Sequence, residues 1–130
     1  MNDQLKTIFD EIQTDKKISF DHFKFLSQEF DERFWRALQI VIEQGVKKYR
    51  FIPSNRVAWI VVGKKRDYLI ISDLYCPCDD FYLSVVIRKT AKMCYHLLSK
   101  VLATAFEYYE EITVEDERYD QLMKDWKEIK

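Results

Sequence analysis

Apolar residues recur every three or four positions in the first part of the chain, which is the period of an amphipathic α-helix. Three helices are expected there. The first begins after a cap at Asn2 or Asp3 and ends at residues 15–17. The second follows Ser19, a suitable N-cap. The third ends at Gly45, which suits the left-handed position after a helix. Residues 1–45 are therefore predicted to form a helical N-terminal part.

From residue 46 onward, polar and apolar residues alternate, and β-branched and aromatic side chains become frequent, as in β-strands. Residues 47–51, 57–62 and 68–72 have this composition, and short segments rich in turn-forming residues separate them. Residues 81–87 have the composition of one more strand, with an irregular insert as the other interpretation. A small antiparallel sheet of three to four strands is expected.

A helical period returns after residue 90, and this helix is expected to pack on the sheet, completing a core of residues 46–109. A last amphipathic helix is predicted over residues 113–130, with Thr113 as its cap. Its apolar stripe consists of Tyr119, Leu122, Met123, Trp126 and Ile129. The predicted fold class is α+β, a single domain over residues 1–130 in which N-terminal and C-terminal helices flank the sheet.

Two short motifs carry the candidate chemistry: Cys76-Pro77-Cys78 and Cys94-Tyr95-His96. They contain all three cysteines of the chain and supply three thiols and one imidazole, the ligands that a tetrahedral zinc ion takes. The other interpretation is that the cysteines are small buried apolar residues. Four protein ligands close the coordination shell, whereas a catalytic zinc keeps one position open. The motifs therefore predict one structural zinc ion.

The spacing of the motifs also indicates where in the fold they lie. Side chains two residues apart on a regular strand are too far apart for two sulfurs to share one metal, and Pro77 suits the bend that Cys76 and Cys78 need. Side chains two residues apart in a helix point in nearly opposite directions, so Cys94 and His96 are expected where a loop enters a helix. The zinc site is therefore predicted at a strand-to-helix junction.

The order C-x-C, fifteen residues, C-x-H resembles the SWIM zinc-finger family. Residues 76–81 are similar to the C-x-C-x-D-F start that is common in that family, and Leu97 and Leu98 supply the apolar pair after the histidine. Ser99 departs from the pattern, because SWIM relatives in recombination often have alanine there. The resemblance covers about residues 57–106.

The resemblance implies a function as well as a metal. The chain is most similar to the free-standing SWIM subunits of Shu-type recombination complexes, which pair with RecA-like recombinase paralogues. The resemblance therefore implies a non-catalytic zinc-binding adaptor that binds such a paralogue and supports homologous recombination and DNA repair. Spacing and composition alone indicate only zinc and a small α+β domain. A third interpretation is an autonomous structural or regulatory domain that holds zinc.

Composition limits the class of protein further. With 130 residues, 48% of them hydrophobic, the chain is long enough to bury one core. Its longest wholly apolar run, residues 57–62, is far too short for a membrane helix. The odd number of cysteines and the lack of a signal-peptide pattern argue against disulfides and for a reducing compartment. A soluble, intracellular protein without a membrane partner is expected.

The net charge of −1 hides an uneven distribution along the chain. Residues 46–106 contain eleven Lys or Arg against four Asp or Glu, whereas the segments before and after are acidic. Because a basic segment can follow a phosphate backbone, direct and sequence-nonspecific binding of nucleic acid, DNA included, is the alternative function. The other interpretation is that the turns are charged because they are solvated, or that the acidic flanks cover the basic face. The candidate nucleic-acid-binding residues are Lys47, Lys48, Arg50, Lys64, Lys65, Arg66, Arg88, Lys89 and Lys92.

Aromatic residues are dense in the second and third predicted helices, and one lies in the last predicted helix. Aromatic side chains anchor many protein interfaces, but they also fill the cores of single chains. The sequence leaves both interpretations open. The candidate partner-binding residues are Phe23, Phe30, Phe34, Trp35 and Trp126.

Enzymatic function is not favoured. Cys94 and His96 are better explained as co-ligands than as nucleophile and base, and His22 stands alone among aromatic residues. The chain has only two glycines, so neither a phosphate-binding loop nor a dinucleotide-binding turn can be built. No catalytic residue and no small-molecule substrate is predicted.

Overall fold

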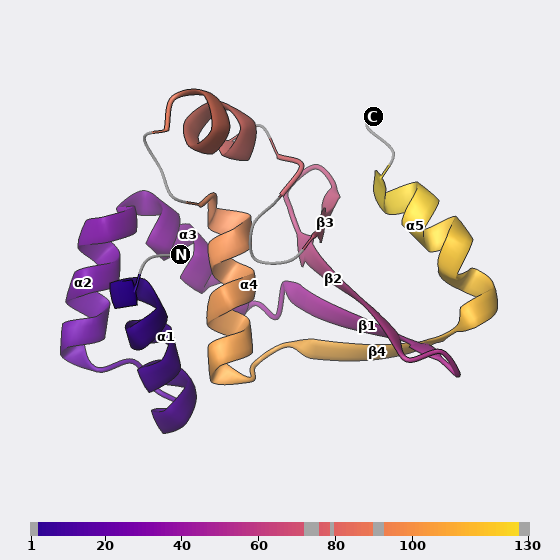
Figure 1. Ribbon diagram of the computed structural model, residues 1–130, viewed down its shortest axis with the longest axis horizontal. Helices are drawn as coiled ribbons and strands as arrows, with labels where there is room; N and C mark the ends of the chain where they lie inside the picture. The colour runs from indigo at the N-terminus through magenta and orange to yellow at the C-terminus, as the bar shows by residue number, and fades with distance from the viewer. Residues whose placement is uncertain (1–2, 72–75, 79, 90–92, 128–130) are drawn as a thin grey trace.

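The structure is a computed structural model that describes residues 3–71, 76–78, 80–89 and 93–127. Its centre is a four-stranded sheet, which has helices α1 to α4 on one side and the C-terminal helix α5 on the other (Figure 1). The α+β class and the placement of helices at both ends confirm the fold class expected from the sequence. In this described part of the chain, every helix is too short or too polar to span a bilayer.

The N-terminal part contains the three expected helices: α1 (Asp3–Asp15), α2 (Phe20–Phe30) and α3 (Glu32–Ile42). Ser19 caps α2, because its hydroxyl accepts a hydrogen bond from the backbone N–H of His22 at 3.1 Å. The His22 ring accepts one from the backbone N–H of Ser19 at 3.2 Å and contacts Glu11 of α1 at 2.7 Å. His22 therefore has a structural role, which is to join α1 to the start of α2.

The chain leaves α3 differently from the expectation. The left-handed residue is Gln44, with a φ of 57°, and Gly45 does not have a positive φ. Gly45 is needed for close approach instead, since a Cβ there would lie 2.8 Å from a methyl carbon of Ile40. The absence of a side chain lets the chain turn tightly into the first strand.

The sheet consists of β1 (Val46–Ile52), β2 (Arg56–Val62), β3 (Asp67–Ile70) and β4 (Glu110–Glu115). The strand order is β3-β2-β1-β4. β1 pairs with β2, and β2 with β3, in antiparallel register, as the sequence predicts. β4 pairs with β1 in parallel register, so the sheet is mixed, and the prediction of a purely antiparallel sheet is wrong. The parallel pair arises because α4 carries the chain back across one face of the sheet before β4 begins (Figure 1).

Two segments have a different secondary structure from that expected. Residues 110–115 form β4, where the predicted C-terminal helix was to begin at residue 113. That helix, α5, covers Tyr119–Lys127 and follows a short 3₁₀ turn, Asp116–Arg118. Residues Phe81–Ile87 form a short π-helix rather than a strand. In both segments, contacts with distant parts of the chain override the local residue preference.

Each face of the sheet has its own core. α4 (Tyr95–Phe106) lies between the N-terminal helices and the sheet, and it is buried on nearly all sides (Figure 1). Alternate residues of β2 serve the two faces: Val61 packs with α4, whereas Ile60 faces α5. The core on the α5 side is formed by Phe51, Ala58, Ile60, Leu69, Val114 and Trp126.

Candidate metal centre

The four predicted zinc ligands lie together on the side of the sheet that α1 to α4 cover, at one end of that side. Cys76 and Cys78 come after β3, while Cys94 is the N-cap of α4 and His96 lies in its first turn. All four residues are buried, and one ligand atom from each lies within 4.8 Å of the others. This is the strand-to-helix junction that the spacing of the motifs predicts.

The geometry and the donor set fit a zinc ion. Sulfur ligands about 2.3 Å from a tetrahedral metal are about 3.8 Å from one another, a separation that the cluster accommodates. Both ring nitrogens of His96 are buried and have no hydrogen-bond partner within the protein. A buried polar atom without a partner is costly, and coordination to a metal satisfies one of the two nitrogens. The site therefore has the ligands and the unsatisfied imidazole that one zinc ion needs.

Backbone amides orient two of the sulfurs. The N–H of Phe81 donates a hydrogen bond to Sγ of Cys78 at 3.3 Å, and the N–H of Leu97 donates one to Sγ of Cys94 at 3.4 Å. Both amides belong to the first turn of the helix that follows the cysteine, where N–H groups have no helical acceptor. Such hydrogen bonds favour the thiolate, which is the form that binds metal.

The three thiols lie close enough to form hydrogen bonds with one another, and these bonds shift their pKa values. The hydrogen bond with Cys76 lowers the pKa of Cys78 far below its usual value, and the same interaction raises that of Cys76. For Cys94, the hydrogen bond with Cys76 lowers the pKa, whereas the hydrogen bond with Cys78 and burial raise it. The net result is a pKa raised to about 12. Cysteines bind metal as thiolates, so zinc binding displaces the protons that these thiols carry.

Aromatic rings enclose the histidine ligand. The ring centres of Tyr68 and Tyr95 lie 4.3 Å and 4.1 Å from that of His96. Ser99, the residue where SWIM relatives in recombination often have alanine, is fully buried, and its hydroxyl donates to the backbone carbonyl of His96 at 2.7 Å. The hydroxyl is therefore satisfied inside the first turn of α4, and the departure from the family pattern leaves the ligand set intact.

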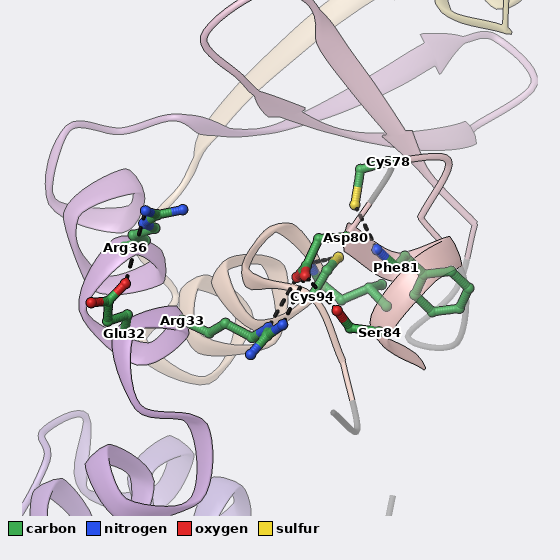
Figure 2. Close-up of polar contacts among 9 residues, drawn as sticks. Glu32, Arg33, Arg36, Cys78, Asp80, Phe81, Ser84 and Cys94 are labelled. Carbon is green, nitrogen blue, oxygen red and sulfur yellow. Dashed lines mark hydrogen bonds and ion pairs between the residues drawn. The ribbon is translucent and has the colours of Figure 1, made fainter. Parts of the chain in front are cut away.

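A side-chain network joins the cysteine motif to α3 (Figure 2). Nε and Nη2 of Arg33 donate hydrogen bonds to the two carboxylate oxygens of Asp80 at 3.0 Å and 2.7 Å, and Oγ of Ser84 donates to the same carboxylate at 3.0 Å. The hydrogen bond from Arg33 is the largest cause of the lowered pKa of Asp80. Sequence reasoning did not single out Arg33, because 47 residues separate it from Asp80.

Many of the candidate nucleic-acid-binding residues have partners within the chain. Lys47 and Arg50 of β1 pair with glutamates of the adjacent β4, at 3.4 Å and 3.0 Å. Nζ of Lys48 lies 5.6 Å from the ring centre of Trp59, and Arg66 donates a hydrogen bond to the carbonyl of Trp126. The acidic C-terminal segment thus covers part of the basic strand. The exposed candidates are Lys64, Lys65, Arg88 and Lys89, and Lys92 lies outside the described residues.

The candidate partner-binding residues divide into buried and accessible ones. Phe30 and Phe34 belong to the core around α4, and Trp126 packs against Tyr49 in the core on the α5 side, with ring centres 4.8 Å apart. The side chains of these three residues fill cores of this chain, so little of their surface is exposed to a partner. Trp35 is 51% exposed, and the ring of Phe23, partly buried, lies against it at 5.0 Å.

A closed C-x-C…C-x-H site at a strand-to-helix junction defines a zinc-finger protein of the SWIM class. The chain is 31% identical over 119 residues to the zinc finger SWIM domain-containing protein 7 homolog of Dictyostelium discoideum, a match that covers 90% of this chain and 76% of that protein. The chain belongs to the family of zinc finger SWIM domain-containing protein 7.

Two vertebrate members of this family also match. The protein of Danio rerio is 33% identical over 73 residues, which cover 55% of this chain and 52% of that protein. The protein of Homo sapiens is 21% identical over 113 residues, which cover 86% of this chain and 81% of that protein. No family model matches the chain. No solved structure matches it.

Proposed function

We propose that this protein is an intracellular, non-catalytic adaptor that binds a RecA-like recombinase paralogue and supports homologous recombination and DNA repair. The observation that carries the proposal is the relationship to zinc finger SWIM domain-containing protein 7 over 90% of the chain. The SWIM module and the helices that flank it resemble the SWIM subunits of Shu-type complexes, which have such partners.

The zinc site supports a structural rather than a catalytic role. Its two cysteine motifs supply four protein ligands, which fill the shell of a tetrahedral zinc ion and leave no position for substrate. Among the described residues, no other group of three or more His, Cys, Asp or Glu side chains is placed to hold a metal. The SWIM module is a non-catalytic module, and the proposed role for zinc is to hold the fold that a partner recognises.

Trp35 is the candidate anchor for the protein partner. It is the exposed member of the predicted partner-binding set, and large aromatic side chains contribute much of the binding energy at interfaces. Its ring packs edge-to-face on Phe23 and on Phe34, with centres 5.0 Å and 5.4 Å away. The core beneath it therefore holds the indole in place on the surface. Less side-chain conformational entropy is then lost when a partner binds.

The test is co-purification of the zinc-loaded protein with each RecA-like paralogue of the same organism. We expect one stable complex, with binding weakened at least tenfold by Trp35→Ala, which corresponds to about 1.4 kcal/mol or more. Tyr108→Ala is the matched control, because Tyr108 is an aromatic residue of similar exposure outside the candidate set. Failure of every paralogue to bind would contradict the adaptor function, whereas equal binding by Trp35→Ala would move the interface elsewhere.

The alternative function is direct binding of nucleic acid without sequence preference. It rests on the four exposed cations that remain after internal pairing: Lys64, Lys65, Arg88 and Lys89. Binding of DNA at low salt that disappears on reversal of these charges, while partner binding persists, would support this function. Absence of binding to single-stranded or duplex DNA at low salt would remove it.

A further inference from the structure

Helix α3 carries no zinc ligand, yet two of its side chains reach the zinc site. Arg33 makes two hydrogen bonds to Asp80, which lies two residues after the second cysteine ligand. Arg36, three positions further along α3, places its guanidinium 5.7 Å from the ring centre of Tyr95, which precedes the histidine ligand. The same face of α3 therefore contacts the chain beside both halves of the ligand set.

The carboxylate of Asp80 is held on several sides. Its two oxygens accept the hydrogen bonds from Arg33, and one of them also accepts from the hydroxyl of Ser84, which is buried. Asp80 is directly followed by Phe81, whose N–H donates to Sγ of Cys78. The peptide that orients a zinc ligand is thus attached to a side chain that α3 holds in place.

This ion pair has the features that make a charge pair effective. The contact is bidentate, with each carboxylate oxygen facing a different guanidinium nitrogen. Its side chains are 30% and 28% exposed, whereas those of Lys16 and Glu107, another ion pair, are 46% and 59% exposed. Partial removal from water reduces the screening that makes surface pairs weak.

We propose that Arg33 and Asp80 are positioning residues of the zinc site, which hold the Cys76–Cys78 half in ligating geometry and slow the release of zinc. For a zinc ion to leave, a cysteine must move away from it, and the chain after Cys78 must move with that cysteine. The attachment of Asp80 to α3 opposes this motion. The inference concerns the metal site alone and is independent of which partner the protein binds.

The test measures how fast the folded, zinc-loaded protein releases zinc to a chromogenic chelator. Arg33→Met and Asp80→Asn each remove the bidentate contact, and Asp80→Asn keeps the shape of the side chain. We expect about tenfold faster release from each variant, the order of magnitude seen when groups outside the first coordination shell are removed. The double variant is expected to release zinc no faster than either single one, because both changes remove the same interaction.

A second cluster in the chain provides a matched control. Asp116 accepts a hydrogen bond from the hydroxyl of Ser54 at 2.7 Å and lies 3.6 Å from Arg56, so it has the same kinds of partner as Asp80. Asp116→Asn and Arg56→Met remove that arrangement at the β1–β2 turn, away from the ligands. Zinc release from these control variants should remain within threefold of the wild-type rate.

Cobalt substitution separates positioning from a change of ligands. Co²⁺ bound to three thiolates and one imidazole should give the same absorption bands in Asp80→Asn as in the wild type, because no ligand is altered. If Arg33→Met does not fold, Arg33→Lys, which keeps the charge and loses the fork geometry, replaces it. The proposal would be overturned if the Asp80 and Arg33 variants released zinc less than threefold faster than the wild type, or if the control variants released it as fast as they do. Additive increases in the release rate of the double variant, or shifted cobalt bands, would also overturn it.

Discussion

Replacement of Trp126 by alanine tests whether this side chain belongs to the core or to a partner interface. The loss of stability that a core role predicts can be worked out from the structure. The side chain is 8% exposed and packs edge-to-face on Tyr49 with ring centres 4.8 Å apart. It belongs to α5, a helix of nine residues. Isolated helices of this length are unstable in water, so α5 depends on its apolar contacts with the sheet.

The expected cost of Trp126→Ala follows from this packing. Replacement of a buried tryptophan by alanine costs about 3–5 kcal/mol, and the lower end applies where the surroundings can move into the space. α5 is short and lies at an edge of the fold (Figure 1), so we expect about 3 kcal/mol. For a domain of this size, such a loss corresponds to a decrease in melting temperature of roughly 10 °C.

The assay is urea unfolding of the zinc-loaded protein followed by far-ultraviolet circular dichroism. Trp35→Ala is the matched control, since Trp35 is 51% exposed and its main contacts are two edge-to-face rings. We expect the control to cost about 1 kcal/mol. The assignment of Trp126 to the core would be refuted if Trp35→Ala destabilised the protein as much as Trp126→Ala, or if Trp126→Ala cost less than about 1 kcal/mol.

Two further predictions concern the turns of the sheet. Gly63→Ala places a Cβ 2.5 Å from a ring carbon of Tyr68 and 2.7 Å from the carbonyl oxygen of Arg66, so we expect a loss of about 1–3 kcal/mol in urea unfolding, and an unchanged midpoint would contradict this. The second prediction concerns Asp116, whose pKa is lowered below 3.8, mainly by the hydrogen bond from Ser54. The ionised carboxylate therefore stabilises the fold at pH values above 3.8, and this stabilisation is lost as the pH falls through the lowered pKa. The difference in urea midpoint between wild type and Asp116→Asn should therefore be constant from about pH 7 to pH 5 and decrease as the pH falls below 3.8 and through the lowered pKa. A difference that stays the same throughout this acid range would refute the prediction.

The zinc ligands could be predicted from the sequence because each half of the site is local. Cys76 and Cys78 are two residues apart, as are Cys94 and His96, and coordination geometry then requires a bend in one motif and a helix start in the other. The partner of Asp80 could not be predicted in this way. Arg33 lies 47 residues from it, and no local pattern indicates which arginine a carboxylate will meet.

The nature of β4 was hidden by its charge. Glu110 and Glu111 favour the start of a helix or a solvated turn when they are considered alone. In the structure they pair with Lys47 and Arg50 of the neighbouring strand. Ile112 and Val114 alternate with polar residues and face the core below α5. This alternation is typical of a strand, but the neighbouring carboxylates favoured a helix start when the sequence was considered alone.

Residues 81–87 show the opposite effect, since their β-branched and aromatic composition favours a strand. The first turn is fixed instead by Asp80 and by the N–H of Phe81, which contact Arg33 and Cys78. These interactions join residues that are distant in the sequence and are present only in the folded arrangement of α3 and the cysteine motif. Tertiary contacts of this kind override a local preference and are not visible in the sequence.

Zinc content is the measurement that tests the central claim most directly. Elemental analysis of the untagged protein should give one zinc per chain, and Cys94→Ser, which removes a buried ligand, should lose both zinc and tertiary structure. Loss of zinc is expected to unfold the protein because structural zinc binding contributes about 10–16 kcal/mol, which is as large as the whole stability of a typical domain. A carefully purified wild-type protein that is folded and contains no zinc would contradict the metal site and the function built on it.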